Sequence, residues 1–144
     1  MKLSRLELEA FGPFAGHEVV DFDALAPHGL FLLNGATGSG KTSVLDAICY
    51  ALYGQVPGQR AGQNLRSDHA DTETGPWVSL EFTTKGRRLK IRRNLPWERP
   101  KQRGTGTTPE RAKALLQEHP DGQWQSSAAK PPKKSPRSAT TWHT

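Results

Sequence analysis

A glycine-rich octapeptide at residues 35–42 constrains the fold of this chain more than any other feature. Its letters, GATGSGKT, match the pattern G-x-x-x-x-G-K-[ST] at every fixed position. The apolar run at residues 30–33 precedes it and predicts a strand buried on both faces. Apolar residues at helical spacing follow it and predict a helix over residues 41–53, with Gly54 as its stop. This order of strand, loop and helix predicts an α/β fold of the P-loop NTPase type.

The octapeptide is suited to binding the phosphates of a nucleoside triphosphate. Glycine lets backbone N–H groups wrap around phosphate oxygens. Lys41, at the start of the helix, can reach the β and γ phosphates, and the Thr42 hydroxyl can bind Mg²⁺. We therefore expect Mg²⁺ with ATP or GTP, between which the loop does not select. The predicted phosphate-binding residues are Gly35, Ala36, Thr37, Gly38, Ser39, Gly40, Lys41 and Thr42, and Thr42 is also the predicted metal ligand.

The acids that hydrolysis requires are harder to find in the sequence. Asp46 follows Thr42 by one helical turn, where it either organises the metal through water or complements the helix dipole. A Walker B element is an apolar strand that ends in Asp and is usually followed by Glu. The run that ends at Asp21 is too short, and the run that ends at Glu81 is interrupted by Ser79. We assign no catalytic residue and expect nucleotide binding without turnover.

Alternating apolar and polar residues predict two antiparallel pairs of strands. The first pair spans residues 6–10 and 17–22 around the Gly/Pro turn at residues 11–14, and the second spans residues 78–82 and 88–92 around Lys85-Gly86. Residues 55–75 show no period and predict a surface excursion. Residues 96–107 read as extended and basic, and residues 110–118 as a short helix.

Basic residues are concentrated in the second part of the chain. Residues 1–82 carry five Lys or Arg against ten acids, a net −5, whereas residues 83–144 carry fifteen against four, a net +11. A localised basic excess favours a polyanionic partner such as DNA, although each charge by itself is also typical of a solvated face. The candidate DNA-contacting residues are Arg88, Lys90, Arg92, Lys101 and Arg103, with Trp97 as a nearby stacking surface.

Composition predicts an ordered domain over residues 1–124 and a disordered basic tail, rich in Pro and Ser, over residues 125–144. The single cysteine, Cys49, cannot form an internal disulfide, which fits a reducing cytoplasm. No apolar segment approaches the roughly 18–20 residues that span a membrane, so we expect a soluble cytoplasmic protein.

The sequence resembles the N-terminal nucleotide-binding lobe of SbcC-type proteins, the ATPase subunit of the SbcC–SbcD DNA nuclease. The resemblance covers about residues 1–124. It rests on MKLSRLELEAFGPF, GLFLLNGATGSGKTSVLDAICYALYG, NLRSDHA and WVSLEFTTKGRRLKIRRNLPWERPKQRGTGTT. The phosphate loop is common to many proteins, but F-G-P-F, D-A-I-x-Y-A-L-Y-G and E-R-P-K-x-R-G together are specific.

The resemblance implies an ABC-type ATPase head with an antiparallel β subdomain. In this family a C-terminal lobe, reached through a long coiled coil, supplies the signature motif and Walker B. Two heads dimerise around ATP and gate the access of double-stranded DNA to a manganese-dependent SbcD-type nuclease, in double-strand break repair and recombination. The resemblance therefore implies ATP and Mg²⁺ as cofactors.

The sequence ends before the expected Q-loop, coiled coil, signature motif and Walker B, and its tail departs from the family. We therefore expect a fragment, from a truncated or frame-shifted longer gene. Two alternatives stay open: the lobe of another coiled-coil ABC ATPase of recombination or chromosome organisation, and a nucleotide-regulated nucleic-acid-binding module.

Overall fold

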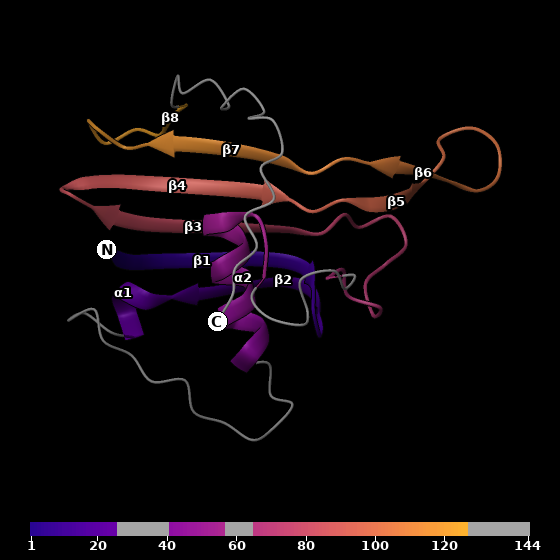
Figure 1. Ribbon diagram of the computed structural model, residues 1–144, viewed down its shortest axis with the longest axis horizontal. Helices are drawn as coiled ribbons and strands as arrows, with labels where there is room; N and C mark the ends of the chain where they lie inside the picture. The colour runs from indigo at the N-terminus through magenta and orange to yellow at the C-terminus, as the bar shows by residue number, and fades with distance from the viewer. Residues whose placement is uncertain (26–40, 57–64, 127–144) are drawn as a thin grey trace, which may run out of the picture.

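A computed structural model describes residues 1–25, 41–56 and 65–126 of the chain (Figure 1). Its centre is a six-stranded antiparallel sheet in the order β2-β1-β3-β4-β7-β8. These strands are β1 (Lys2–Phe11), β2 (Phe14–Asp21), β3 (Trp77–Thr84), β4 (Arg87–Asn94), β7 (Lys113–Glu118) and β8 (Gln125–Ser126). The short helix α1 (Phe22–Leu25) follows β2, and the longer α2 (Lys41–Tyr53) crosses one face of the sheet. Strands β5 (Trp97–Pro100) and β6 (Thr107–Glu110) pair as a separate ribbon that extends beyond one end of the sheet.

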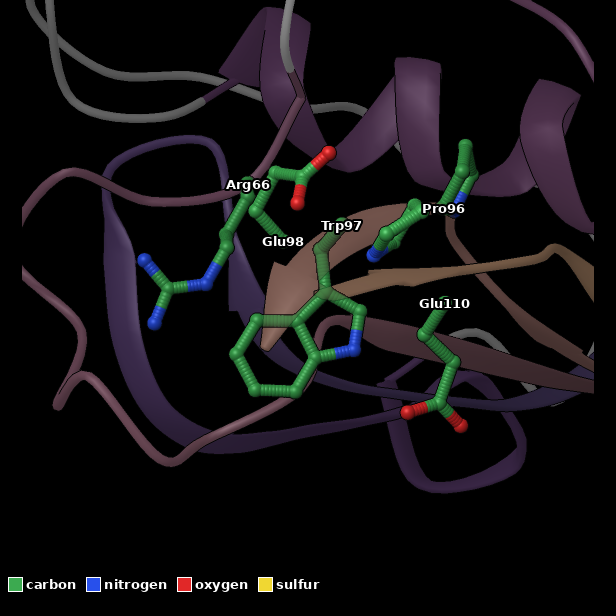
Figure 2. A pocket seen from close by; sticks show the side chains of 6 residues that line it. Arg66, Pro96, Trp97, Glu98 and Glu110 are labelled. Carbon is green, nitrogen blue, oxygen red and sulfur yellow. The ribbon is translucent and has the colours of Figure 1, made fainter. Parts of the chain in front are cut away.

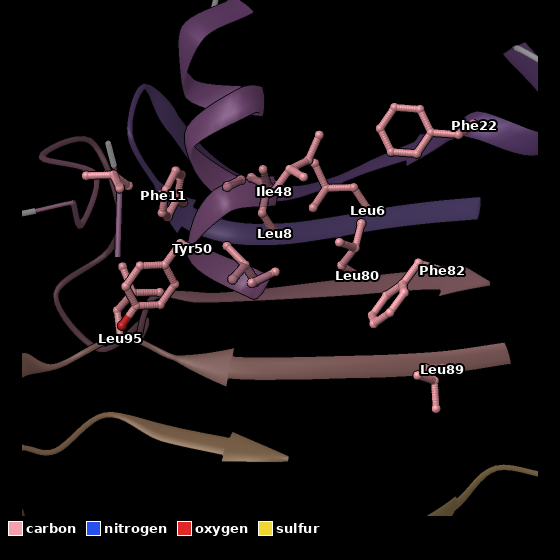
Figure 3. Packing of buried hydrophobic residues seen from close by; sticks show 14 residues of the cluster. Leu6, Leu8, Phe11, Phe22, Ile48, Tyr50, Leu80, Phe82, Leu89 and Leu95 are labelled. Carbon is pink, nitrogen blue, oxygen red and sulfur yellow. The ribbon is translucent and has the colours of Figure 1, made fainter. Parts of the chain in front are cut away.

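The two faces of the sheet differ because side chains alternate along each strand. One face, which we call the inner face, carries Leu6 and Leu8 of β1 beside Val78 and Leu80 of β3, all at most 1% exposed. Helix α2 covers this face through apolar residues such as Ile48 (Figure 3). The opposite, outer face carries the polar residues that alternate with them. The core therefore lies between α2 and the sheet.

Both predicted strand pairs are confirmed. β1 and β2 are antiparallel neighbours, and β3 and β4 form a hairpin in uninterrupted register from Trp77 with Asn94 to Thr84 with Arg87. Lys85 and Gly86 both have positive φ, 49° and 74°, as a two-residue turn with the twist of a hairpin requires. The predicted helix over residues 41–53 is confirmed as α2.

The predicted helix over residues 110–118 is wrong, because residues 113–118 form strand β7. β7 adds to the edge of β4, which offers a row of unpaired backbone groups. Leu116 then lies beside Ile91 at the margin of the core. Arg87 donates two hydrogen bonds to Glu118, of 2.8 and 2.7 Å, and this contact lowers the pKa of the Glu118 carboxyl. Pairing with β4 outweighs the local helical preference.

The predicted apolar face of α2 is also partly wrong. Leu45 is 49% exposed, whereas Asp46 is only 4% exposed and Ala47 is fully buried. The sheet therefore contacts a face of the helix rotated from the one that hydrophobicity alone selects, and it buries small residues that allow close approach.

The surface excursion predicted for residues 55–75 is more ordered than expected where the structure describes it. Ser67 donates its backbone N–H to the Ala10 carbonyl at 2.8 Å, and Gly12 donates to the Leu65 carbonyl at 2.8 Å. Ser67 is fully buried. Residues 65–67 therefore extend the backbone hydrogen bonding at the end of β1.

The described part of the chain is mostly antiparallel sheet, and the parallel core of an α/β fold is not among residues 1–25, 41–56 and 65–126. The strand predicted at residues 30–33 lies outside them. β8 ends at Ser126, two residues past the predicted domain boundary, and the rest of the predicted tail, residues 127–144, also lies outside.

Candidate functional site

The N-terminus of α2 presents two of the eight predicted phosphate-binding residues. Lys41 is the first residue of the helix and Thr42, which is exposed, is the second. Residues Gly35, Ala36, Thr37, Gly38, Ser39 and Gly40 lie outside the described part of the chain. The first backbone N–H groups of a helix have no acceptor within it and carry partial positive charge. An ammonium, a hydroxyl and these N–H groups together fit a phosphate with Mg²⁺.

Asp46 lies farther along α2, on the side that packs against the fold. Its 4% exposure makes it a buried polar residue of the interior. It is not in the first turn of the helix, where the structure has no acid. Its buried position separates it from the exposed hydroxyl of Thr42.

The other end of α2 is held by the central sheet. Gly54 follows the helix with a φ of 73°, and its N–H donates to the Tyr50 carbonyl at 2.8 Å, which is a left-handed C-cap. Arg93 of β4 donates from Nε to the Ala51 carbonyl at 2.8 Å. A cation at this end favours the helix dipole. Strand β4 therefore fixes the helix that carries Lys41 and Thr42.

The two acids that imitate Walker B lie apart from the α2 side of the sheet. Asp21 accepts a hydrogen bond from the backbone N–H of Ala24 at 3.1 Å, at the start of α1. Glu81 is on the outer face, because its neighbours Leu80 and Phe82 point into the core beneath α2. Glu81 forms ion pairs with Arg88 at 3.1 Å and with Lys90 at 3.4 Å.

Arg88, Lys90 and Arg92 share the outer face of β4, as their alternation predicted. Glu81 offsets part of their charge, which the sequence did not suggest. Arg92 lies over the Trp77 ring at 4.0 Å, and Lys90 lies over the Trp124 ring at 4.8 Å. Trp77 also donates from Nε1 to Glu9 at 3.0 Å. The outer face thus combines aromatic rings with charges of both signs.

The structure separates the five candidate DNA-contacting residues into two groups. Lys101 and Arg103 lie in the exposed turn of residues 101–106, at the tip of the β5–β6 ribbon (Figure 1). The aromatic partners of β4 are Trp77 and Trp124, and Trp97 instead packs with Arg66 at 5.1 Å. Alternation along β3 already placed Trp77 beside Glu81, whereas nothing in the sequence linked Trp124 to β4.

Comparison with known proteins places this arrangement in a family. Residues 5–126 match the AAA domain. The chain belongs to the AAA domain family. Its relatives include SbcC proteins: the SbcC subunit of nuclease SbcCD from Vibrio cholerae is 50% identical over 117 residues, 81% of this chain and 12% of that protein. The SbcC proteins of Treponema pallidum and Lactococcus lactis are 45% identical over 97 residues and 35% identical over 116.

The resemblance to SbcC-type ATPases that the motifs predicted is thereby confirmed, together with the P-loop NTPase class. The T. pallidum match covers 66% of this chain and 9% of that protein, and the L. lactis match 81% and 11%. The chain thus spans about a tenth of the length of these relatives. Within residues 1–25, 41–56 and 65–126, no helix is both long and apolar enough to cross a membrane.

Proposed function

We propose that this chain is the ATP-binding N-terminal lobe of an SbcC-like subunit of an ATP-dependent DNA exonuclease, acting in double-strand break repair and recombination. One observation carries the proposal: the Lys41-Thr42 pair that ends the phosphate-loop pattern opens a 13-residue helix held at its far end by the sheet. The names of the relatives support the choice of complex.

In this proposal residues 35–42 bind the ATP phosphates. The Lys41 ammonium neutralises phosphate charge, and the Thr42 hydroxyl is a Mg²⁺ ligand. Because α2 is capped by Gly54 and bonded to Arg93, both groups are carried by a helix of fixed direction. The metal, when bound, supplies further positive charge to the phosphates.

The proposed partners follow from the relatives. The signature motif and Walker B belong to a C-terminal SbcC lobe outside this sequence, with which the chain forms a head, and heads dimerise on ATP. An SbcD-type metallonuclease binds the head, and double-stranded DNA contacts Arg88, Lys90 and Arg92 on the outer face and Lys101 and Arg103 on the ribbon. The proposed location is the cytoplasm.

Calorimetric titration with Mg-ATP tests the nucleotide site. The wild-type chain is expected to bind, and Lys41→Ala is expected to lose binding because the ammonium is the one side-chain cation of the loop. Lys85→Ala, at the exposed β3–β4 turn, is the matched control and keeps the affinity. Thr42→Val should remove the dependence on Mg²⁺, and GTP tests base selection. Equal ATP affinity in wild type and Lys41→Ala would exclude the proposal.

A further inference from the structure

Two hollows share Trp97 and Glu110 at the base of the β5–β6 ribbon. The first has a volume of about 410 Å³ and is lined by Arg66, Pro96, Trp97, Glu98, Pro109 and Glu110 (Figure 2). The second has a volume of about 420 Å³ and adds Glu73, Arg99, Pro100, Lys101 and Gln102 to the two shared residues. Both volumes fall in the range of sites for small organic groups, roughly 300–1,000 Å³.

The indole of Trp97 is held in place before any ligand binds. The Arg66 guanidinium lies 5.1 Å from the ring centre and donates to the Thr74 carbonyl at 3.1 Å and to the Asp71 carbonyl. A Cβ at Gly75 would lie 3.1 Å from Cε2 of the indole, so only glycine permits this close approach. A fixed aromatic wall loses little entropy when a flat group stacks on it.

The charges around the hollows favour a flat, uncharged ligand over an ion. Arg66, Arg99 and Lys101 balance Glu73, Glu98 and Glu110, so the lining has no net charge. Glu110 bonds to Arg99 at 3.1 Å, which holds its carboxylate at the wall between the hollows. Carboxylates only accept hydrogen bonds. They therefore select groups that carry N–H donors.

We propose that these hollows bind one unpaired nucleobase, stacked on Trp97, at the end of a DNA strand whose phosphates contact the ribbon tip. This rests on the proposed DNA binding of the ribbon. Lys101 lines the second hollow and belongs to the same exposed turn as Arg103, so a base and its neighbouring phosphates can be bound together. An unpaired terminal base enters at the least cost in lost stacking and pairing.

The carboxylates give the site a preference among bases. Adenine, cytosine and guanine carry exocyclic amino groups that can donate to Glu98 or Glu110, whereas thymine does not. The preferred substrate is therefore duplex DNA with an overhanging amino-bearing base. Stacking by itself accepts every base.

Anisotropy titrations of the whole chain with a labelled duplex test this site. The duplex is blunt, or carries a one-nucleotide overhang of adenine, thymine or an abasic sugar. Wild type is expected to bind the adenine overhang about five- to 150-fold more tightly than the blunt or abasic duplex, the range of a base–aromatic stack. Free AMP as competitor distinguishes a base in a strand from a free nucleotide: strong competition would assign the hollows to nucleotides and overturn the DNA-end assignment.

Three variants localise the effect. Trp97→Ala should remove the overhang preference and leave blunt-duplex affinity unchanged, and Trp97→Phe should retain part of it, with thermal melting to confirm folding. Trp124→Ala, which removes a partly exposed tryptophan elsewhere, should keep the preference. Glu98→Gln combined with Glu110→Gln should abolish the choice of adenine over thymine. Equal affinity of wild type for overhang and blunt duplexes overturns the nucleobase site and leaves the proposed function intact, whereas loss of all duplex binding contradicts the proposed DNA contacts.

Discussion

Arg93 of β4 donates a 2.8 Å hydrogen bond from Nε to the carbonyl oxygen of Ala51, in the last turn of α2. The same strand carries Arg88, Lys90 and Arg92 on its outer face. β4 is therefore bonded on one side to the helix of the phosphate site and carries candidate DNA contacts on the other. A displacement of β4 by DNA would move the helix that carries Lys41.

Arg93→Ala should lower the free energy of unfolding by about 2 kcal/mol, because a charge-assisted hydrogen bond to a helix carbonyl is lost. Urea denaturation measures the change. Arg87→Ala on the same strand, which removes an exposed ion pair, should cost much less because solvent screens such pairs. Equal losses in the two variants would show that the Ala51 contact contributes no more than a surface pair.

Gly54→Ala should destabilise the chain by about 1–2 kcal/mol, because a φ of 73° is unfavourable for any residue with a Cβ. The added Cβ would also lie 3.2 Å from Nη1 of Arg93. Gly16→Ala is the matched control, since nothing lies within 4 Å of its Cβ position and its backbone is not in the left-handed region. A shift in the urea midpoint for Gly16→Ala as large as that for Gly54→Ala would contradict the C-cap.

Tyr50 should make the fold sensitive to alkaline pH. Burial raises the pKa of its phenol above the ordinary value of 10.0, and the charge of Arg93 opposes this in part. A raised pKa in the folded state means that the neutral phenol is favoured, so its contribution is complete below pH 10 and is lost as pH rises through the folded pKa. Tyr50→Phe should reduce the loss of stability above pH 10, in urea midpoints measured across this range. Tyr53→Phe, on an exposed ring, should leave the loss unchanged.

Glu81→Gln should strengthen binding to duplex DNA, because it removes the charge that Arg88 and Lys90 now pair with. If both cations then reach phosphates, the slope of log affinity against log salt should steepen by about two. Anisotropy at several salt concentrations measures both effects. Glu18→Gln, an exposed acid on β2, controls for the change in net charge. A Glu81→Gln variant that binds with wild-type affinity and slope would place the DNA contacts elsewhere than on β4.

Local patterns predicted the parts of the fold whose partners are near in sequence. The β3–β4 hairpin and the bounds of α2 follow from alternation, helical spacing, Lys85-Gly86 and Gly54. The strand at residues 113–118 could not be predicted, because it depends on the free edge of β4, and the buried face of α2 depends on which side the sheet contacts. At the site, alternation placed Arg88, Lys90 and Arg92 on one face. Their pairing with Glu81 and Trp124 requires strand register and a long-range return of the chain.

The chain alone is expected to bind ATP without hydrolysing it. Phosphoryl transfer needs a positioned water and charge stabilisation as well as bound phosphates. Among the described residues, the acids nearest to a Walker B pattern are committed elsewhere: Asp21 caps α1, and Glu81 pairs with cations on the outer face. Phosphate release over hours measures turnover, with Lys41→Ala as the control for contaminating ATPases. Addition of a separately expressed C-terminal SbcC lobe should restore Lys41-dependent turnover, since the proposal assigns the missing catalytic groups to that lobe. Turnover by the isolated chain that Lys41→Ala abolishes would instead mean that this sequence contains its own catalytic acid.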